Sequence, residues 1–134
     1  MRDLALRRLG RHDEAREVSR RALAAIDRRL SIDPGEARAW YLGAGMLLNL
    51  GEPERAFEYA EQAIAVDPEE VSTLYNVGCM YAQTGNYDRA IENLAAAIER
   101  GFASPEWIDS DPDWDKIRDD PRFQEIRRRM DKRD

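Results

Sequence analysis

Apolar and small side chains recur along this chain at a fixed interval. Trp40 returns as Leu74, and the turn glycine Gly51 returns as Gly85. The second copy of the pattern falls at Leu74, Val77, Gly78, Gly85, Ala90, Leu94 and Ala97. A fixed period of about 34 residues is typical of stacked helical repeats, in which each unit buries its apolar face against its neighbours. We call the interval from Trp40 to Leu74 the repeat period, and we predict an all-α repeat fold whose function lies on a surface.

Within each repeat, apolar residues spaced three and four apart predict two helices. Glycine and proline mark the helix ends, because glycine adopts positive φ at helix C-termini and proline cannot continue the hydrogen-bond ladder. The helices expected in the two clear repeats cover residues 36–50, 53–66, 69–84 and 87–100.

The beginning of the chain does not follow the spacing of the two clear repeats. The interval from Gly10 to Pro34 is seven positions longer than the interval from Gly51 to Pro68. We interpret Gly10 as the turn glycine of the first repeat, which ends one helix and lets another begin. The helices expected there cover residues 1–9 and about 12–32, the second capped by His12 or Asp13.

The seven extra positions of the first repeat correspond to about two helical turns, so the apolar face stays in phase. A helix of that length is expected to project past its neighbours. Its outer end, near Arg28 and Arg29, is expected to reach beyond the repeat stack.

Alanines occupy one face of the second helix in each clear repeat. Small side chains on one face let two helices approach closely, so a structural role is expected for these positions. They are Ala56, Ala60, Ala63, Ala90 and Ala97.

This spacing and choice of residues resemble the tetratricopeptide repeat, a helix-turn-helix unit that holds other proteins. The resemblance covers about residues 1–102 and depends on the turn glycines and the alanines. It implies a right-handed α-solenoid with a partial unit over 1–34 and full units over 35–68 and 69–102. C-terminal capping helices over 103–134 are expected to follow.

A different and shorter repeat appears after Gly101. Asp111-Pro112 is followed nine positions later by Asp120-Pro121. Aspartate accepts hydrogen bonds from the first N–H groups of a helix, and proline fits the first helical position. The large apolar residues after each pair are expected to cover the end of the last unit: Trp114, Ile117, Phe123 and Ile126.

The tail also resembles the C-terminal ends of repeat regions in bacterial multidomain signalling proteins. In those proteins the repeats follow a serine/threonine kinase, a nucleotide cyclase or a TolB-like domain. The resemblance implies that this chain is the C-terminal interaction module of such a protein.

Composition narrows the functional classes. The chain has 21 Lys and Arg against 27 Asp and Glu, a net charge of −6 that argues against a nucleic-acid partner. No apolar stretch approaches the roughly 20 residues that span a bilayer, so no membrane partner and a cytoplasmic location are expected. A single cysteine, Cys79, excludes an internal disulfide and a cysteine-rich zinc site. No cofactor is expected.

Alternating aspartates in the tail imitate the spacing of a calcium loop, with Asp120 at the twelfth position counted from Asp109. Trp114 occupies the position that requires glycine, and Asp120 is shorter than the usual bidentate glutamate. Helix capping explains Asp111 and Asp120 without an ion, so no metal site is predicted.

The sequence supplies no evident catalytic apparatus. His12 is the only histidine and Cys79 is the only thiol. A general base requires an aligned nucleophile in a pocket, and neither residue has an obvious companion. We predict a non-enzymatic protein.

The resemblance implies that the first helix of each unit lines a concave groove. Tyrosines, amides and arginines there suit an extended peptide or a helix. The residues expected to bind it are Arg7, Arg8, Arg38, Tyr41, Asn49, Tyr75, Asn76, Cys79 and Gln83. Some members of the family hold a peptide's terminal carboxylate with lysine, arginine and asparagine. Tyr41 and Tyr75 stand where that lysine would be, so this clamp is incomplete.

Two other functions are compatible with the sequence. One is self-association into a homodimer through a truncated N-terminal edge at Leu4, Leu6 and Leu9. The other is regulation of an upstream kinase or cyclase domain. A groove that is only solvated is also compatible with these residues.

Overall fold

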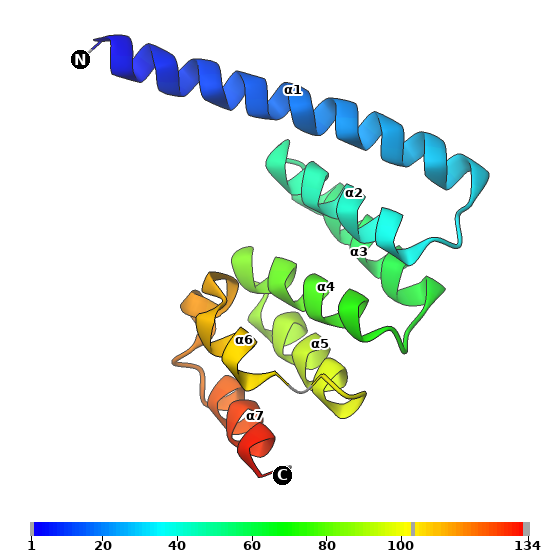
Figure 1. Cartoon of the computed structure of the whole chain (residues 1–134), viewed down its shortest axis with the longest axis vertical. Helices are drawn as coiled ribbons and strands as arrows, with labels where there is room; N and C mark the ends of the chain where they lie inside the picture. Colours follow the sequence, from blue (N-terminus) through cyan, green and yellow to red (C-terminus); the bar gives the residue numbers. More distant parts are fainter. Residues whose placement is uncertain (1, 103, 133–134) are drawn as a thin grey trace. The chain divides into compact units, whose positions relative to one another are not determined.

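A computed structural model describes residues 2–102 and 104–132, with side chains described from Gly10 onward. All elements in this part of the chain are helical, which confirms the all-α prediction. They are α1 (Arg2–Ile32), α2 (Ala37–Asn49), α3 (Pro53–Val66), α4 (Val71–Gln83), α5 (Tyr87–Glu99), α6 (Pro105–Ser110), the 3₁₀ helix η1 (Pro112–Ile117) and α7 (Pro121–Asp131) (Figure 1). The chain divides into two compact units, Met1–Val66 and Asp67–Asp134.

Helices α2 to α5 begin and end within two residues of the expected positions. The turn after α2 is a Schellman motif, in which Glu52 N–H donates to Leu47 O at 2.9 Å and Gly51 N–H donates to Leu48 O at 3.0 Å. Gly51 has a φ of +75°, and Gly85 repeats this geometry after α4 with a φ of +83°. Glycine adopts these left-handed angles without the steric penalty that a β-carbon brings.

The prediction of a helix break at Gly10 is wrong. Helix α1 runs without interruption for 31 residues, and Gly10 lies inside it. A helix-ending glycine needs positive φ, and among the described residues only Gly51, Gly85 and Gly101 adopt it. Glycine within a helix costs only about 1 kcal/mol relative to alanine, and the favourable residues on both sides of Gly10 offset that cost.

The expectation that α1 projects at its Arg28 and Arg29 end is also wrong. Arg29 forms an ion pair with Glu36, immediately before α2, so this end of α1 is tied to the next helix. The part of α1 that extends beyond α2 is its N-terminal half (Figure 1).

The first compact unit is built on the close packing of α2 with α3. Ala44 on α2 and Ala56 and Ala60 on α3 are completely buried. A β-carbon added at Gly43 would lie 2.7 Å from Cδ2 of Tyr59. The Tyr59 ring packs edge-on against Trp40, with ring centroids 5.1 Å apart. The alanine face therefore has the structural role expected from the sequence.

A hydrogen bond fixes Tyr59 from the other side. Its hydroxyl donates to Asp27 Oδ1 on α1 at 2.6 Å, which joins the first and third helices of the unit. Burial and this hydrogen bond both raise the pKa of Tyr59.

The second compact unit pairs α4 with α5 and adds the tail. Asp111 and Asp120 cap η1 and α7 as predicted, accepting from Asp113 N–H at 3.0 Å and Arg122 N–H at 2.9 Å. Three tail elements complete this unit, with η1 packed on α4 and α7 packed on both α5 and α6. The four residues expected to cover the end of the last repeat are all buried: Trp114, Ile117, Phe123 and Ile126.

Replacing either of two glycines on α2 by alanine should change the free energy of unfolding, but in opposite directions. Gly43→Ala should lower the free energy of unfolding by about 1–3 kcal/mol, because Tyr59 is held by Trp40 and Asp27 and cannot move aside freely. Gly45→Ala should raise it by about 0.5–1 kcal/mol, because a β-carbon there meets no atom within 4 Å and alanine favours the helix. Urea denaturation of both variants measures the two effects. Equal destabilisation by both would contradict the packing described here.

Candidate functional site

A stripe of polar and aromatic side chains follows one face of α2. Arg38, Tyr41, Gly45 and Asn49 are spaced three or four residues apart, so they lie above one another on the helix. Arg38 and Asn49 are exposed, and Tyr41 is half-buried. Because a β-carbon at Gly45 would meet nothing within 4 Å, the stripe has a notch between Tyr41 and Asn49. We call these four residues the α2 stripe.

Neighbouring segments contact both ends of α2. At the start of α2, the Trp40 indole N–H donates to Pro34 O at 2.8 Å. At its end, the Asn49 amide lies 3.5 Å from the hydroxyl of Ser19 on α1, a long hydrogen bond that leaves the amide largely available. Arg38 pairs with no acid among the residues whose side chains are described. The α2 stripe therefore offers a cation, an amide and an aromatic ring on a rigid helix.

The corresponding face of α4 is not open. Tyr75 and Cys79, which were expected to line the groove, are buried. Gln83 is exposed but donates to Asp113 of η1, and the exposed Asn76 donates to Ser72 O at 2.7 Å on its own helix. The expectation that Tyr75 and Cys79 lie on an accessible surface is therefore wrong, because the tail of the same chain covers them.

Tyr75 is the centre of this contact. Its hydroxyl donates to Asp111 Oδ2 at 2.6 Å and accepts from the Trp114 indole N–H at 2.9 Å. Its ring stacks on Phe102, with centroids 4.5 Å apart and planes 12° apart. Burial and the hydrogen bond to Asp111 raise the pKa of Tyr75 far above its usual value. The sequence identified Trp114 as apolar cover but gave no sign that its N–H and Asp111 both bind Tyr75.

Cys79 lies beside the same carboxylate, with Sγ 3.8 Å from Asp111 Oδ2. Burial raises the pKa of the Cys79 thiol, and the negative charges of Asp111 and Asp113 raise it further. A thiol in these surroundings is a poor nucleophile, since reactive cysteines need nearby positive charge.

Ligand atoms of Cys79, Asp111 and Asp113 lie within 4.8 Å of one another, which is close enough for a metal ion. Both carboxylates already have hydrogen-bond donors, Asp111 from Tyr75 and Asp113 from Gln83. The cluster is therefore explained by the docking of η1 on α4.

The remaining acids of the calcium-like spacing bind other partners. Asp109 forms a two-pronged ion pair with Arg127, at 2.8 Å for both contacts, and the pair lowers the pKa of Asp109. Asp115 pairs with Arg118 and Asp120 pairs with Arg122. These three carboxylates serve helix ends and ion pairs instead of a common centre.

Two expected site residues, Arg7 and Arg8, lie on the described backbone of α1, but their side chains fall outside the described residues. His12 is exposed on α1.

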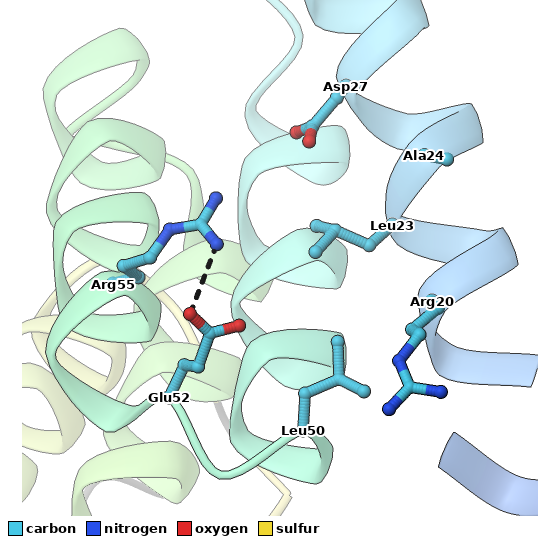
Figure 2. Close-up of a pocket in the computed structure, with 7 residues that line it drawn as sticks. All are labelled: Arg20, Leu23, Ala24, Asp27, Leu50, Glu52 and Arg55. Carbon is cyan, nitrogen blue, oxygen red and sulfur yellow. Dashed lines mark hydrogen bonds and ion pairs between the residues drawn. The ribbon is translucent and has the colours of Figure 1, made fainter. Parts of the chain in front are cut away.

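An open hollow of about 390 Å³ lies between α1, α3 and the turn that joins α2 to α3 (Figure 2). Leu23 and Leu50 line it together with two cations and two anions, which are Arg20, Arg55, Asp27 and Glu52. Arg55 is bonded to Glu52, and Asp27 accepts from Tyr59. Arg20 pairs with Glu17 at 3.6 Å, so all four charged groups of the hollow already have partners. With its charges balanced in this way, the hollow is a less suitable binding site than the α2 stripe.

Paired antiparallel helices, glycine turns and a small-residue seam that recurs at the repeat period define a helical repeat protein. Two family models described as tetratricopeptide repeat match residues 4–69 and 47–106. The chain belongs to the tetratricopeptide-repeat family, whose members are generally non-catalytic scaffolds, and it is a protein–protein interaction module.

A stretch of 48 residues is 38% identical to the Hsp70-Hsp90 organizing protein of Triticum aestivum. The match covers 36% of this chain and 8% of that protein. In the described part of the chain, no helix combines the length and apolarity that crossing a membrane requires.

Replacing Asp111 should destabilise the protein much more than replacing the nearby Asp115. Asp111→Ala removes both the cap of η1 and the acceptor of the Tyr75 hydroxyl, and should cost about 2–4 kcal/mol of stability. Asp115→Ala removes only an exposed ion pair to Arg118 and should cost less than about 0.5 kcal/mol. Denaturant unfolding compares the two variants. A similar cost for both would show that the contact with Tyr75 contributes little.

Cys79 should make the free energy of unfolding change with pH in the alkaline range. Its pKa is raised in the folded state, so the unfolded chain releases the thiol proton first, from about pH 8.5 upward. The free energy of unfolding should therefore fall as pH rises above about 8.5, by up to about 1.4 kcal/mol per pH unit. The Cys79→Ala variant should lose most of this slope between about pH 8.5 and 9.5, below the pKa of about 10 at which tyrosines of the unfolded chain ionise. Unfolding curves recorded across this range test the expectation, and identical slopes would contradict it.

Proposed function

We propose that the protein binds an extended peptide segment of a partner protein along the α2 stripe. The observation that carries this proposal is the contrast between two equivalent helices. The face of α2 with Arg38, Tyr41 and Asn49 is accessible, whereas the corresponding face of α4 is covered by η1.

The chemistry of the α2 stripe suits a peptide. Tyr41 offers a flat apolar ring with a polar tip, a combination common in protein interfaces. The notch at Gly45 lets a peptide backbone approach the helix, and Asn49 can both donate to it and accept from it. Arg38 favours an acidic side chain or a terminal carboxylate on the peptide.

Arg7 and Arg8 extend the proposal to α1. One repeat period before α2, Arg7 holds the position of Tyr41 and Arg8 that of Leu42. They would add positive charge beside Arg38 when the N-terminal part of α1 packs as the first helix of a repeat, and an acidic peptide would then be favoured.

The name of the wheat relative suggests Hsp70 and Hsp90 as partners to test. The proposal does not favour them, because Tyr41 replaces the lysine with which related repeats hold a terminal carboxylate. The equivalent Tyr75 is buried, so it cannot supply a second contact. An internal acidic peptide is the better candidate.

The parent protein is a separate part of the proposal. The paired Asp-Pro segments of the tail support a place at the C-terminal end of a bacterial multidomain signalling protein in the cytoplasm. In that setting, this module would recruit a partner or regulate an upstream kinase or cyclase domain.

Selection from a displayed library of random peptides, with free and with blocked carboxyl termini, should yield acidic sequences that bind the protein. Tyr41→Ala should weaken binding of a selected peptide by about tenfold or more, since it removes a central aromatic contact. Gly45→Leu should weaken it similarly by filling the notch while leaving the fold intact. Fluorescence polarisation with the labelled peptide measures both losses.

Tyr87→Ala is the matched control, because Tyr87 is also half-buried but lies on α5. It should leave the affinity unchanged. A peptide whose binding survives Tyr41→Ala and Gly45→Leu, or is lost equally with Tyr87→Ala, would contradict the assignment of the site to α2.

A further inference from the structure

The N-terminal half of α1 carries the residue pattern of a first repeat helix. Gly10 lies one repeat period before Ala44 and two before Gly78, so Gly10 holds a close-packing position of the repeat. Leu6 and Leu9 likewise precede Trp40 and Gly43 by one repeat period. In this register Gly10 corresponds to Ala44, and the interval from Gly10 to Pro34 equals the interval from Ala44 to Pro68, so no insertion of seven residues is needed. The family match begins within this segment, at residue 4.

The C-terminal half of α1 carries the pattern of a second repeat helix. Ala22 precedes Ala56 by one repeat period, and Ile26 precedes Ala60 by the same interval. Pro34 then precedes Pro68. Both helices of one complete repeat are therefore present within α1, fused into a single straight helix.

The repeat within α1 lacks the glycine that separates the two helices in the other repeats. Gly51 and Gly85 turn the chain with positive φ, and the corresponding residue in α1 is Glu17. A glutamate at that angle is disfavoured by its β-carbon. Glu17 also pairs with Arg21 at 3.2 Å, one helical turn ahead, an arrangement compatible with a continuous helix. The sequence therefore favours the straight form at the point where the other repeats bend.

The straight form leaves a packing face uncovered. Ala56 and Ala60 are completely buried against the first helix of their repeat, whereas the equivalent Ala22 and Ile26 are only half-buried. Ala25 is exposed. The residues that would cover this face lie on the same helix but cannot reach it, since Gly10 and Ala25 are about 22 Å apart at 1.5 Å per residue.

We propose that two copies of this chain exchange these halves, so that residues 2–16 of one α1 pack as the first helix of the repeat against residues 19–32 of the other. Gly78 and Ala90 oppose each other within a repeat, and the same register sets Gly10 opposite Ala22 of the second copy. Gly10 and Ala22 are equidistant from Arg16, so one two-fold axis near Arg16 satisfies both halves at once. The two α1 helices form an antiparallel pair that completes two repeats without any turn.

The match between the uncovered face of α1 and the segment around Gly10 supports a second copy of the chain as the partner that covers this face. The half-buried Ala22 and the exposed Ala25 hold the positions of Ala90 and Asn93, which face Gly78 of the first helix in the last repeat. The segment with the matching small residue, Gly10, is part of this chain, and a second copy presents it in the required antiparallel direction. The proposal is independent of peptide binding to α2.

Cysteine crosslinking tests the register. A β-carbon at Gly78 would lie 3.4 Å from Cβ of Asn93, close to the separation in disulfides, and the equivalent pair in α1 is Gly10 and Ala25. In a Cys79→Ala background, Gly10→Cys with Ala25→Cys should form an intermolecular disulfide with oxidised glutathione and run as a dimer without reductant. Gly10→Cys with Ala24→Cys is the matched control, because the exposed Ala24 lies on a different face. It should crosslink at least tenfold more slowly.

An intramolecular disulfide in the Gly10 and Ala25 pair would overturn the proposal, because it would mean that α1 folds back on itself. Absence of any disulfide, or equal dimer formation by the control, would overturn it as well.

A second measurement does not depend on engineered cysteines. Light scattering of the unmodified protein over a hundredfold concentration range should show a dimer, and Glu17→Gly should raise its dissociation constant at least tenfold by restoring the turn glycine. Glu14→Gly, an equally exposed change in the same helix, should have a much smaller effect. A monomer at all concentrations, or the same response to both glycines, would overturn the proposal.

Discussion

The distance between paired helices is the constraint on which this structure depends. A helix pair can approach closely only where one helix presents glycine or alanine to the other. In the first unit, Tyr59 lies in the space that a β-carbon at Gly43 would need. In the second, a β-carbon at Gly78 would lie 3.4 Å from the carbonyl oxygen of Ala90 and 3.3 Å from the ring of Trp114. Because Gly43 and Gly78 carry no side chain, the rings of Tyr59 and Trp114 can lie directly against the backbone at these positions.

The second constraint is the direction of the chain at the end of each first helix. Gly51 and Gly85 reverse it with left-handed backbone angles, and the hydrogen bonds of the Schellman motif hold that reversal. Glu17 occupies the same position in α1 and the helix continues through it. The comparison shows that the small-residue seam and the reversal are separable. A segment can keep the pattern of a repeat helix while its connection no longer brings the two halves together.

Much of the fold could be predicted from the sequence because its determinants are local. The spacing of apolar residues, the turn glycines and the Asp-Pro pairs located α2 to α5 and the capped helices of the tail. The prediction that Gly10 ends a helix is wrong because glycine is common both at helix ends and at close-packing positions of helix pairs. Only the comparison with Ala44 and Gly78, one and two repeat periods later, distinguishes these two uses. The burial of Tyr75 and Cys79 could not be predicted, because their cover comes from Asp111 and Trp114, which are distant in the sequence. On α2, by contrast, Arg38 and Asn49 are exposed and Tyr41 is half-buried, and their role in binding stays a prediction.

Asp111 belongs to three structures at once. It ends α6, its side chain starts η1, and the same side chain accepts a hydrogen bond from Tyr75 on α4. Helix α6 and η1 have six residues each, too few to be stable in isolation, so the helical order of η1 depends on its packing on α4 and that of α6 on its packing on α7. We therefore expect the helical structure of α6 and η1 to be lost together with their docking, because neither element is long enough to stay helical once detached.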